Sequence, residues 1–236
     1  MEPIIHICKT SQDLANKFAR QLIIWVKETK QDTFHLVLSG GKTPSLLFSV
    51  LAGKYVHDVP WHKIHFWWGD ERMVPANNPD SNFGVVNKLL LSRIKLFPSQ
   101  IHQIHGDEDS THEAKRYGSE ILSHVPLSDG WPVFDLIILG LGEDGHTASI
   151  FPGQMHLMES DEITKIALHP VTGQQRITLT GKVFNNAKKV AFLISGESKA
   201  RIFDEIIHNQ KSAENYPAYH IHPAGELHWF ADNINK

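Results

Sequence analysis

One continuous stretch, residues 134–153, constrains the fold more than any other part of the chain. It opens with the apolar run FDLIIL, which is typical of a short strand buried on both faces of a parallel sheet. Gly140, Gly142 and Gly145 follow, and glycine allows both sharp turns and a close approach of the backbone to a ligand. Because open α/β sheets bind ligands at the carboxyl ends of their strands, this turn is the first candidate for a functional site.

The spacing of the three glycines also matches the G-x-G-x-x-G fingerprint of dinucleotide-binding folds. That fingerprint requires a helix that opens at the third glycine and an acidic residue about twenty positions later. Here Pro152 and Gly153 interrupt the required helix, and Asp161 and Glu162 lie in a polar stretch rather than at the end of a strand. Binding of a nicotinamide cofactor is therefore the less favoured interpretation.

Composition limits the classes of protein that need to be considered. The 236 residues are enough for one α/β domain, and we expect a single domain over residues 1–236. A net charge of −3 gives no reason to expect nucleic acid or an anionic membrane as a partner. The single cysteine, Cys8, suits a reducing compartment, and no segment has the length of a signal peptide core or a membrane span. We therefore expect a cytoplasmic protein; its oligomeric state stays open, and a monomer is compatible with the sequence.

The sixteen histidines invite a test for metal binding. Three pairs are close in sequence: His62 and His65, His102 and His105, His220 and His222. None of these pairs forms an HExxH motif, and no cysteine cluster accompanies them. We interpret them as surface and loop histidines and predict no metal site.

Strands and helices alternate along the chain. Strands are predicted at residues 4–7, 34–38, 64–68, 134–139, 175–179, 189–195 and 227–230. A helix capped by Ser11 follows the first strand, one capped by Ser81 follows the third, and a capping box of Ser110 with Glu113 opens another. This alternation predicts an α/β fold with a mostly parallel open sheet and helices on both faces, similar to a Rossmann fold.

A second glycine turn follows the strand at 34–38. Its residues are Ser39, Gly40, Gly41, Lys42 and Thr43. Pro44 suits the first turn of the next helix, whose free N–H groups and dipole would attract a phosphate. It is not a Walker A loop, because Leu36 stands where the first glycine is required. An anion site and an ordinary turn between strand and helix both stay open.

Four segments together resemble the 6-phosphogluconolactonases. They read SGGKTP at 39–44, GDERMVP at 69–75, GLGEDGHTASIFPG at 140–153 and QRITLT at 175–180. GESKA at 196–200 and the closing PAYHIHP and WFAD segments fit the same pattern, so the resemblance covers nearly the whole chain. It implies an isomerase/CoA-transferase-like variant of the α/β fold.

Glucosamine-6-phosphate deaminases share the fold and the glycine turns. They usually carry DEY where this chain has Asp70, Glu71 and Arg72, and GHIAFNEPG where it continues from His146. On both counts this chain resembles the lactonases. Lys42 departs from the family pattern, since many relatives carry serine or another small residue there, and it adds a cation near the expected phosphate.

The resemblance implies roles for the catalytic residues. His146 is the expected base that takes a proton from water, since a neutral imidazole is available at cytosolic pH; the alternative is a histidine that satisfies loop backbone groups. Asp144 either orients this imidazole or caps the following segment. Arg72 is expected to contact the sugar acid or the oxyanion, unless it forms a salt bridge to Asp70 or Glu71 in a solvated loop.

The resemblance also implies the residues that hold the substrate. The backbone of residues 39–43 would bind the phosphate together with Arg176 and Lys199, and Asp70 is a further expected substrate-binding residue. No step requires a metal or an organic cofactor.

The implied function is hydrolysis of 6-phospho-glucono-1,5-lactone to 6-phosphogluconate in the oxidative branch of the pentose phosphate pathway, by a carboxylic ester hydrolase. Two alternatives remain at this point. One is a glucosamine-6-phosphate deaminase/isomerase, and the other is a sensor that binds a sugar phosphate without turnover.

Overall fold

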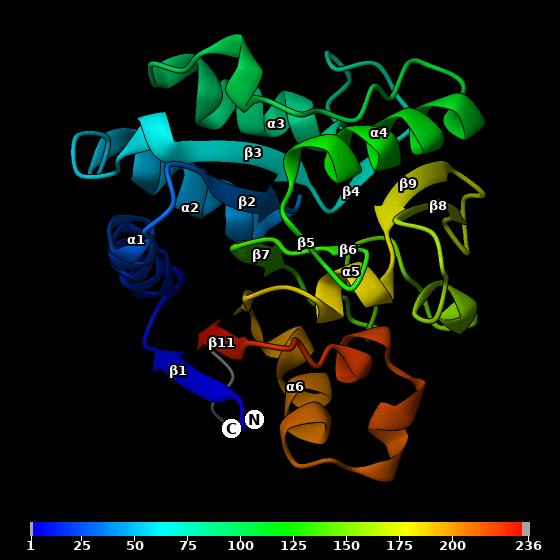
Figure 1. Cartoon of the computed structure of the whole chain (residues 1–236). Helices are drawn as coiled ribbons and strands as arrows, with labels where there is room; N and C mark the ends of the chain where they lie inside the picture. Colours follow the sequence, from blue (N-terminus) through cyan, green and yellow to red (C-terminus); the bar gives the residue numbers. More distant parts are fainter. Residues whose placement is uncertain (1, 233–236) are drawn as a thin grey trace.

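A six-stranded sheet, parallel at every pairing, forms the centre of the computed structural model, which describes residues 2–232 (Figure 1). The strands lie in the order β1 (Ile4–Cys8), β11 (Glu226–Asp232), β10 (Lys189–Ser195), β7 (Leu136–Leu139), β2 (Phe34–Leu38) and β3 (Ile64–Trp68). The predicted α/β class with a parallel open sheet is confirmed.

The order of the strands reverses between β2 and β7. From β2 the chain proceeds outward to β3, whereas from β7 it proceeds in the other direction to β10 and β11. The loops that leave β2 and β7 therefore diverge at the carboxyl edge of the sheet. In open α/β sheets this divergence leaves a crevice in which ligands bind.

Helices cover both faces of the sheet. The helices are α1 (Ser11–Glu28), α2 (Lys42–Gly53), α3 (Asn82–Leu89), α4 (Ser110–His124), α5 (Gly181–Asn185) and α6 (Ala200–Ile207). Two neighbouring residues of β11 show the two layers: Trp229 packs against Phe203 of α6, and Phe230 packs edge-on against Phe18 of α1. Successive residues of a strand point to opposite faces, so α1 and α6 lie on opposite sides (Figure 1).

Short 3-10 helices complete the regular structure: η1 (Trp61–Lys63), η2 (Leu91–Arg93), η3 (Pro98–Gln100), η4 (Met155–Leu157), η5 (Glu197–Lys199), η6 (Lys211–Asn215) and η7 (Pro217–His220).

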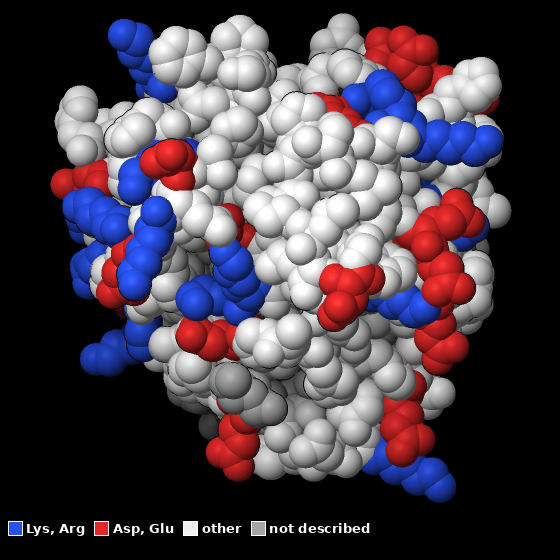
Figure 2. All heavy atoms as spheres, viewed as in Figure 1, with Lys and Arg blue, Asp and Glu red and all other residues white. Residues whose placement is uncertain are grey.

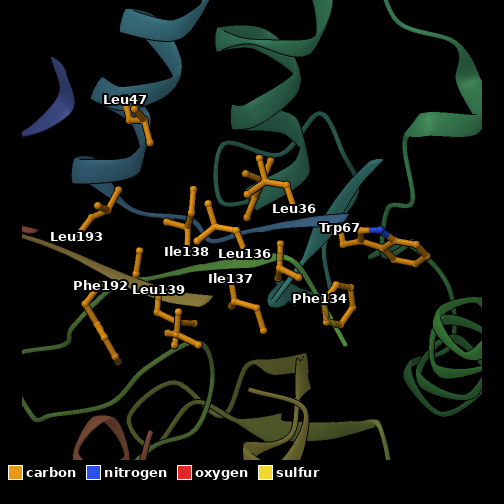
Figure 3. Packing of buried hydrophobic residues seen from close by; sticks show 14 of the residues in the cluster. Leu36, Leu47, Trp67, Phe134, Leu136, Ile137, Ile138, Leu139, Phe192 and Leu193 are labelled. Carbon is orange, nitrogen blue, oxygen red and sulfur yellow. The ribbon is translucent and has the colours of Figure 1, made fainter. Parts of the chain in front are cut away.

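The core explains why β7 is apolar at every position. Leu136 and Ile138 lie on the same side as Leu47 of α2, while Ile137 and Leu139 lie on the opposite side (Figure 3). All four side chains of β7 are fully buried. Burial of each such side chain stabilises the fold by roughly 1.5–3 kcal/mol. Neither face of β7 can therefore carry polar side chains.

A second, three-stranded antiparallel sheet lies beside the first. It contains β4 (Asp70–Arg72), β9 (Gln175–Leu179) and β8 (Thr164–Leu168), and a small hairpin joins β5 (Leu127–Ser128) to β6 (Trp131–Pro132). The interpretation of residues 70–72 as a solvated loop is wrong, because Asp70 and Glu71 are only 4% and 1% exposed. Pairing with β9, about a hundred residues later, buries this charged segment.

Two helices are capped by the residue before the predicted cap. Thr10, not Ser11, caps α1 and accepts a hydrogen bond from the Asp13 backbone N–H. Asp109 caps α4, and Glu113 accepts a hydrogen bond from the His105 backbone instead of closing a capping box. The cap of α3 by Ser81 is confirmed.

Several histidines are buried, so the interpretation of surface and loop histidines is wrong for them. His35, His102 and His228 are at most 5% exposed. The His102 ring stacks on Trp67 with ring centres 3.8 Å apart, and Trp67 Nε1 donates to His35 Nδ1 over 3.2 Å. Aromatic stacking and hydrogen bonds make burial of these polar rings acceptable. Within residues 2–232, no group of three or more His, Cys, Asp or Glu side chains is arranged to hold a metal ion.

The surface carries both signs of charge. Figure 2 shows Lys and Arg interspersed with Asp and Glu over this face of the molecule, in keeping with the small net charge of −3. Every helix in residues 2–232 is too short or too polar to cross a bilayer.

We expect His35 to make stability depend on pH. Burial lowers the pKa of His35 from 6.5 to about 4, so on acidification the unfolded chain takes up this proton before the folded one. The contribution of the neutral His35 ring to the free energy of unfolding is fully present above pH 6.5 and is lost as the pH falls towards 4. His35→Asn retains an acceptor for Trp67. In urea unfolding, this variant should lose less free energy of unfolding on acidification than the wild type, by up to about 3 kcal/mol. An exposed control, His57→Asn, should keep the wild-type slope; the same slope in His35→Asn would contradict this account.

Candidate active site

A cavity of about 310 Å³ lies at the carboxyl edge of the parallel sheet, where the loops after β2 and β7 diverge. Ten of the eleven residues predicted from sequence line it: Ser39, Gly40, Gly41, Lys42, Thr43, Asp70, Arg72, His146, Arg176 and Lys199. The eleventh, Asp144, contacts the His146 ring. Residues far apart in the sequence thus meet at one crevice.

The turn after β7 holds the imidazole of His146 against the cavity. The Gly142 backbone N–H donates to the His146 carbonyl over 2.9 Å, which closes the turn. A Cβ atom on Gly142 would lie 2.1 Å from His146 Nδ1, so only glycine leaves room for the ring in this position. Gly145 has a φ of +82°, in the left-handed region that favours glycine.

Asp144 is hydrogen-bonded to this ring and to the backbone beside it. Its Oδ1 lies 2.6 Å from His146 Nδ1 and also accepts the His146 backbone N–H over 3.1 Å. Partial burial acts to raise the pKa of Asp144, but the hydrogen bonds from His146 outweigh it, and the pKa lies below its usual value. An ionised carboxylate only accepts, so in the neutral ring Nδ1 carries the proton and Nε2 is left as a base.

The C-terminal part of the chain supports the same turn. The Tyr216 ring packs so closely on Gly145 that a Cβ there would lie 2.4 Å from it. The Gly145 carbonyl accepts the Ala218 backbone N–H over 3.1 Å, and Tyr216 Oη donates to Glu205 over 2.6 Å. The position of the His146 turn therefore depends on packing with residues that follow it by some seventy positions.

Two arginines lie side by side across the β4–β9 pair, where Arg72 and Arg176 are opposite each other. Arg72 Nη1 donates to the Asp80 carbonyl over 2.6 Å. In the described part of the chain, the buried Nε atoms of both arginines lack a hydrogen-bond partner, and Arg72 forms no ion pair with Asp70 or Glu71. Burial, together with the charge of Arg72, lowers the pKa of Arg176. Such paired cations are suited to an anionic ligand.

The turn after β2 also lines the cavity. Gly41 is the N-cap of α2 with a φ of +113°, and no side chain caps this helix end. The free N–H groups of the first turn and the helix dipole therefore favour an anion here. Lys42 and Lys199 line the same part of the cavity. Burial lowers the pKa of Lys199, while Glu143 opposes this shift and Lys42 adds to it.

Sequence reasoning missed several residues of the cavity wall, among them Asn82, Glu143 and Ala148. Asn82 Nδ2 donates to the Asp70 carbonyl over 2.9 Å, and a Cβ on Gly40 would lie 1.9 Å from Asn82 Oδ1. Ser149 Oγ donates to Asp70 Oδ2 over 2.6 Å. No local motif signals these contacts, because each joins segments that meet only in the folded chain.

Comparisons with known proteins agree with this arrangement. The family model described as glucosamine-6-phosphate isomerases/6-phosphogluconolactonase matches residues 9–229. A protein from Haemophilus influenzae named 6-phosphogluconolactonase is 42% identical over 227 residues, which cover 94% of each chain.

Solved structures show the same fold. One titled devB protein superposes with a TM-score of 0.90 at 36% identity, covering 98% of both chains. A 6-phosphogluconolactonase from Trypanosoma brucei superposes with a TM-score of 0.87 at 27% identity, covering 99% of this chain and 97% of the other.

Fold and site together define an α/β protein with a polar, cation-lined crevice at the switch point of a parallel sheet. More narrowly, this chain belongs to the glucosamine-6-phosphate isomerase/6-phosphogluconolactonase family.

We expect Gly142→Ala to displace the imidazole without unfolding the protein. Since the added Cβ would occupy space next to His146 Nδ1, the hydrogen bond to Asp144 should break. The pKa of Asp144 should then rise towards its ordinary value, and NMR titration of the carboxyl carbons measures it. Gly53→Ala, where a Cβ meets nothing within 4 Å, is the control. An Asp144 that titrates as in the wild type would argue against the contact.

Proposed function

We propose that this chain hydrolyses 6-phospho-glucono-1,5-lactone to 6-phosphogluconate, in the oxidative branch of the pentose phosphate pathway. The observation that carries the proposal is one cavity that combines an imidazole hydrogen-bonded to Asp144 with an uncapped helix end and the cations of Arg72, Arg176 and Lys199. Relatives over 94% of the chain bear the name 6-phosphogluconolactonase, which supports this choice of substrate.

The phosphate is proposed to bind at the turn of residues 39–43. The N–H groups at the start of α2 provide donors there, and Lys199 and Arg176 provide charge. Lys42 adds a further cation at the same wall. A phosphate held in this way leaves the sugar ring to extend across the cavity towards His146, with Asp70 beside it.

The chemistry is assigned to His146 and Arg72. Nε2 takes a proton from a water molecule, and the water oxygen attacks the C1 carbonyl carbon. The resulting oxyanion is stabilised by the Arg72 guanidinium, a fixed cation in a partly enclosed site. Collapse of the intermediate breaks the bond from C1 to the ring oxygen, which receives the proton held by His146, and the C1 carboxylic acid so formed releases its proton to solvent. Water is added across one ester bond, so the reaction consumes no redox cofactor.

We further infer that the partner is a free small molecule in the cytoplasm. The mixed surface charge offers no extended basic surface on the face in Figure 2 for nucleic acid, and the single Cys8 suits a reducing compartment. Fractionation of cells that express the tagged protein tests this location, and recovery with the membrane fraction would contradict it.

Replacement of the proposed base should remove most of the catalysis. We expect His146→Gln to lower kcat by ~10²–10⁴-fold, because positioned proton transfer contributes about that much. The assay follows lactone hydrolysis above the spontaneous background. The exposed His156→Gln should keep wild-type activity. Ammonia release from glucosamine 6-phosphate without lactone hydrolysis would favour the deaminase, and binding without any turnover would favour a sensor.

Replacement of the proposed phosphate ligands should weaken binding more than turnover. We expect Lys199→Met or Arg176→Met to raise KM by roughly tenfold or more, since a hydrogen bond to a charged group contributes about 1.5–3 kcal/mol. Lys165→Met, which removes a cation paired with Glu162 outside the cavity, should leave KM unchanged. Equal KM values for all of these variants would place the phosphate elsewhere.

A further inference from the structure

Glu71 is a buried carboxylate directly behind the cavity wall. It lies in β4 between Asp70 and Arg72, which both line the cavity, whereas Glu71 does not. Successive residues of a strand point to opposite sides, so the Glu71 side chain is directed away from the ligand space. Only 1% of the residue is exposed. A buried charge needs several hydrogen-bond partners, and the role of Glu71 depends on which groups those are.

Four donors surround the two carboxylate oxygens. Oε1 accepts the backbone N–H groups of Arg72 and Asn82 over 2.8 and 2.7 Å. Oε2 accepts the Phe83 backbone N–H over 2.7 Å and the Ser81 hydroxyl over 3.1 Å. Three of these donors belong to the cap and first turn of α3. The carboxylate thus joins the start of α3 to β4 through hydrogen bonds at both oxygens.

Two residues of the cavity wall depend on this junction. Asn82, whose backbone is bonded to Glu71, directs its side chain to Asp70 and fills the space beside Gly40. The Arg72 guanidinium donates to the Asp80 carbonyl, one residue before the cap of α3. If the start of α3 moved away from β4, both the amide and the guanidinium would lose their present positions.

We propose that Glu71 is a positioning residue: by joining the first turn of α3 to β4, it fixes Arg72 and Asn82 at the cavity wall in the geometry that binds the substrate. This inference rests on the proposed function for its kinetic readout, but it concerns a residue that does not touch the ligand.

The matched variants are Glu71→Gln and Asp135→Asn. In Glu71→Gln one carboxylate oxygen is replaced by an amide NH₂ group. Depending on its orientation, this group would face either the Phe83 N–H or the Arg72 and Asn82 N–H groups. Because two donors cannot form a hydrogen bond with each other, the junction should loosen. Asp135 is likewise buried and accepts hydrogen bonds from the His35 backbone and Lys188, but it precedes β7, at the edge opposite the cavity. Both variants should lower the free energy of unfolding, which urea titration measures.

Only Glu71→Gln should change ligand binding. Burial raises the pKa of Glu71 to about 7 against the effect of its backbone hydrogen bonds, so measurements at pH 8 keep the wild-type carboxylate charged. We expect kcat per folded molecule to fall about tenfold, since Arg72, the proposed oxyanion ligand, is misplaced, and KM for the lactone to rise several-fold, since Asn82 no longer supports the turn at Gly40 that is proposed to hold the phosphate. Asp135→Asn should retain the wild-type KM. A merely structural role would reduce the folded fraction but leave KM unchanged.

Binding of inorganic phosphate, followed by calorimetry, separates this inference from the proposed function. Glu71→Gln should bind phosphate several-fold more weakly than the wild type and Asp135→Asn equally well, whether or not lactone is hydrolysed. If Glu71→Gln does not fold, Ser81→Ala removes one of the four donors and should shift KM and phosphate affinity in the same direction. Wild-type KM and phosphate affinity in whichever variant folds would overturn the proposal.

Discussion

The pairing of β7 with β2 and β10 is the constraint on which the site depends. Leu36 lies opposite Leu136 and Val37 opposite Ile137, so the two strands end at nearly the same height. Ser39 Oγ then donates to the Ile138 carbonyl over 2.8 Å. This hydrogen bond joins the turn after β2 to β7, the strand that precedes the His146 turn. Burial of a four-residue strand on both faces therefore sets the distance between the turn that is proposed to bind the phosphate and the turn that holds the His146 imidazole.

The sequence predicts those parts of the fold whose signals are local. The strands β2, β3, β9 and β10 have the predicted bounds, because each combines a short apolar or alternating run with turn residues at its ends. β4 could not be predicted: three consecutive charged residues resemble a loop, and only contact with β9 and α3 buries them. The buried His35 and His102 have the same explanation, since their aromatic partner Trp67 is distant in sequence.

The site likewise has parts that the sequence predicts and parts that it does not. Glycine turns and the helix start at Pro44 are visible in the sequence, and the family resemblance adds residues such as Arg176 and Lys199, which the structure brings to the same cavity. The contacts that hold these groups are not visible. Asn82 reaches Asp70 and the space beside Gly40 only because a strand and a helix meet, and such tertiary contacts leave no periodic signal.

The central claim is spatial: one ligand spans the cavity with its phosphate at residues 39–43 and its C1 carbon facing His146. A crystal structure with bound 6-phosphogluconate tests this claim most directly. We expect phosphate oxygens within hydrogen-bond distance of the first N–H groups of α2 and of Lys199, and a C1 carboxylate beside His146 Nε2 and Arg72. A ligand bound in the reverse orientation, or in another cavity, would contradict it.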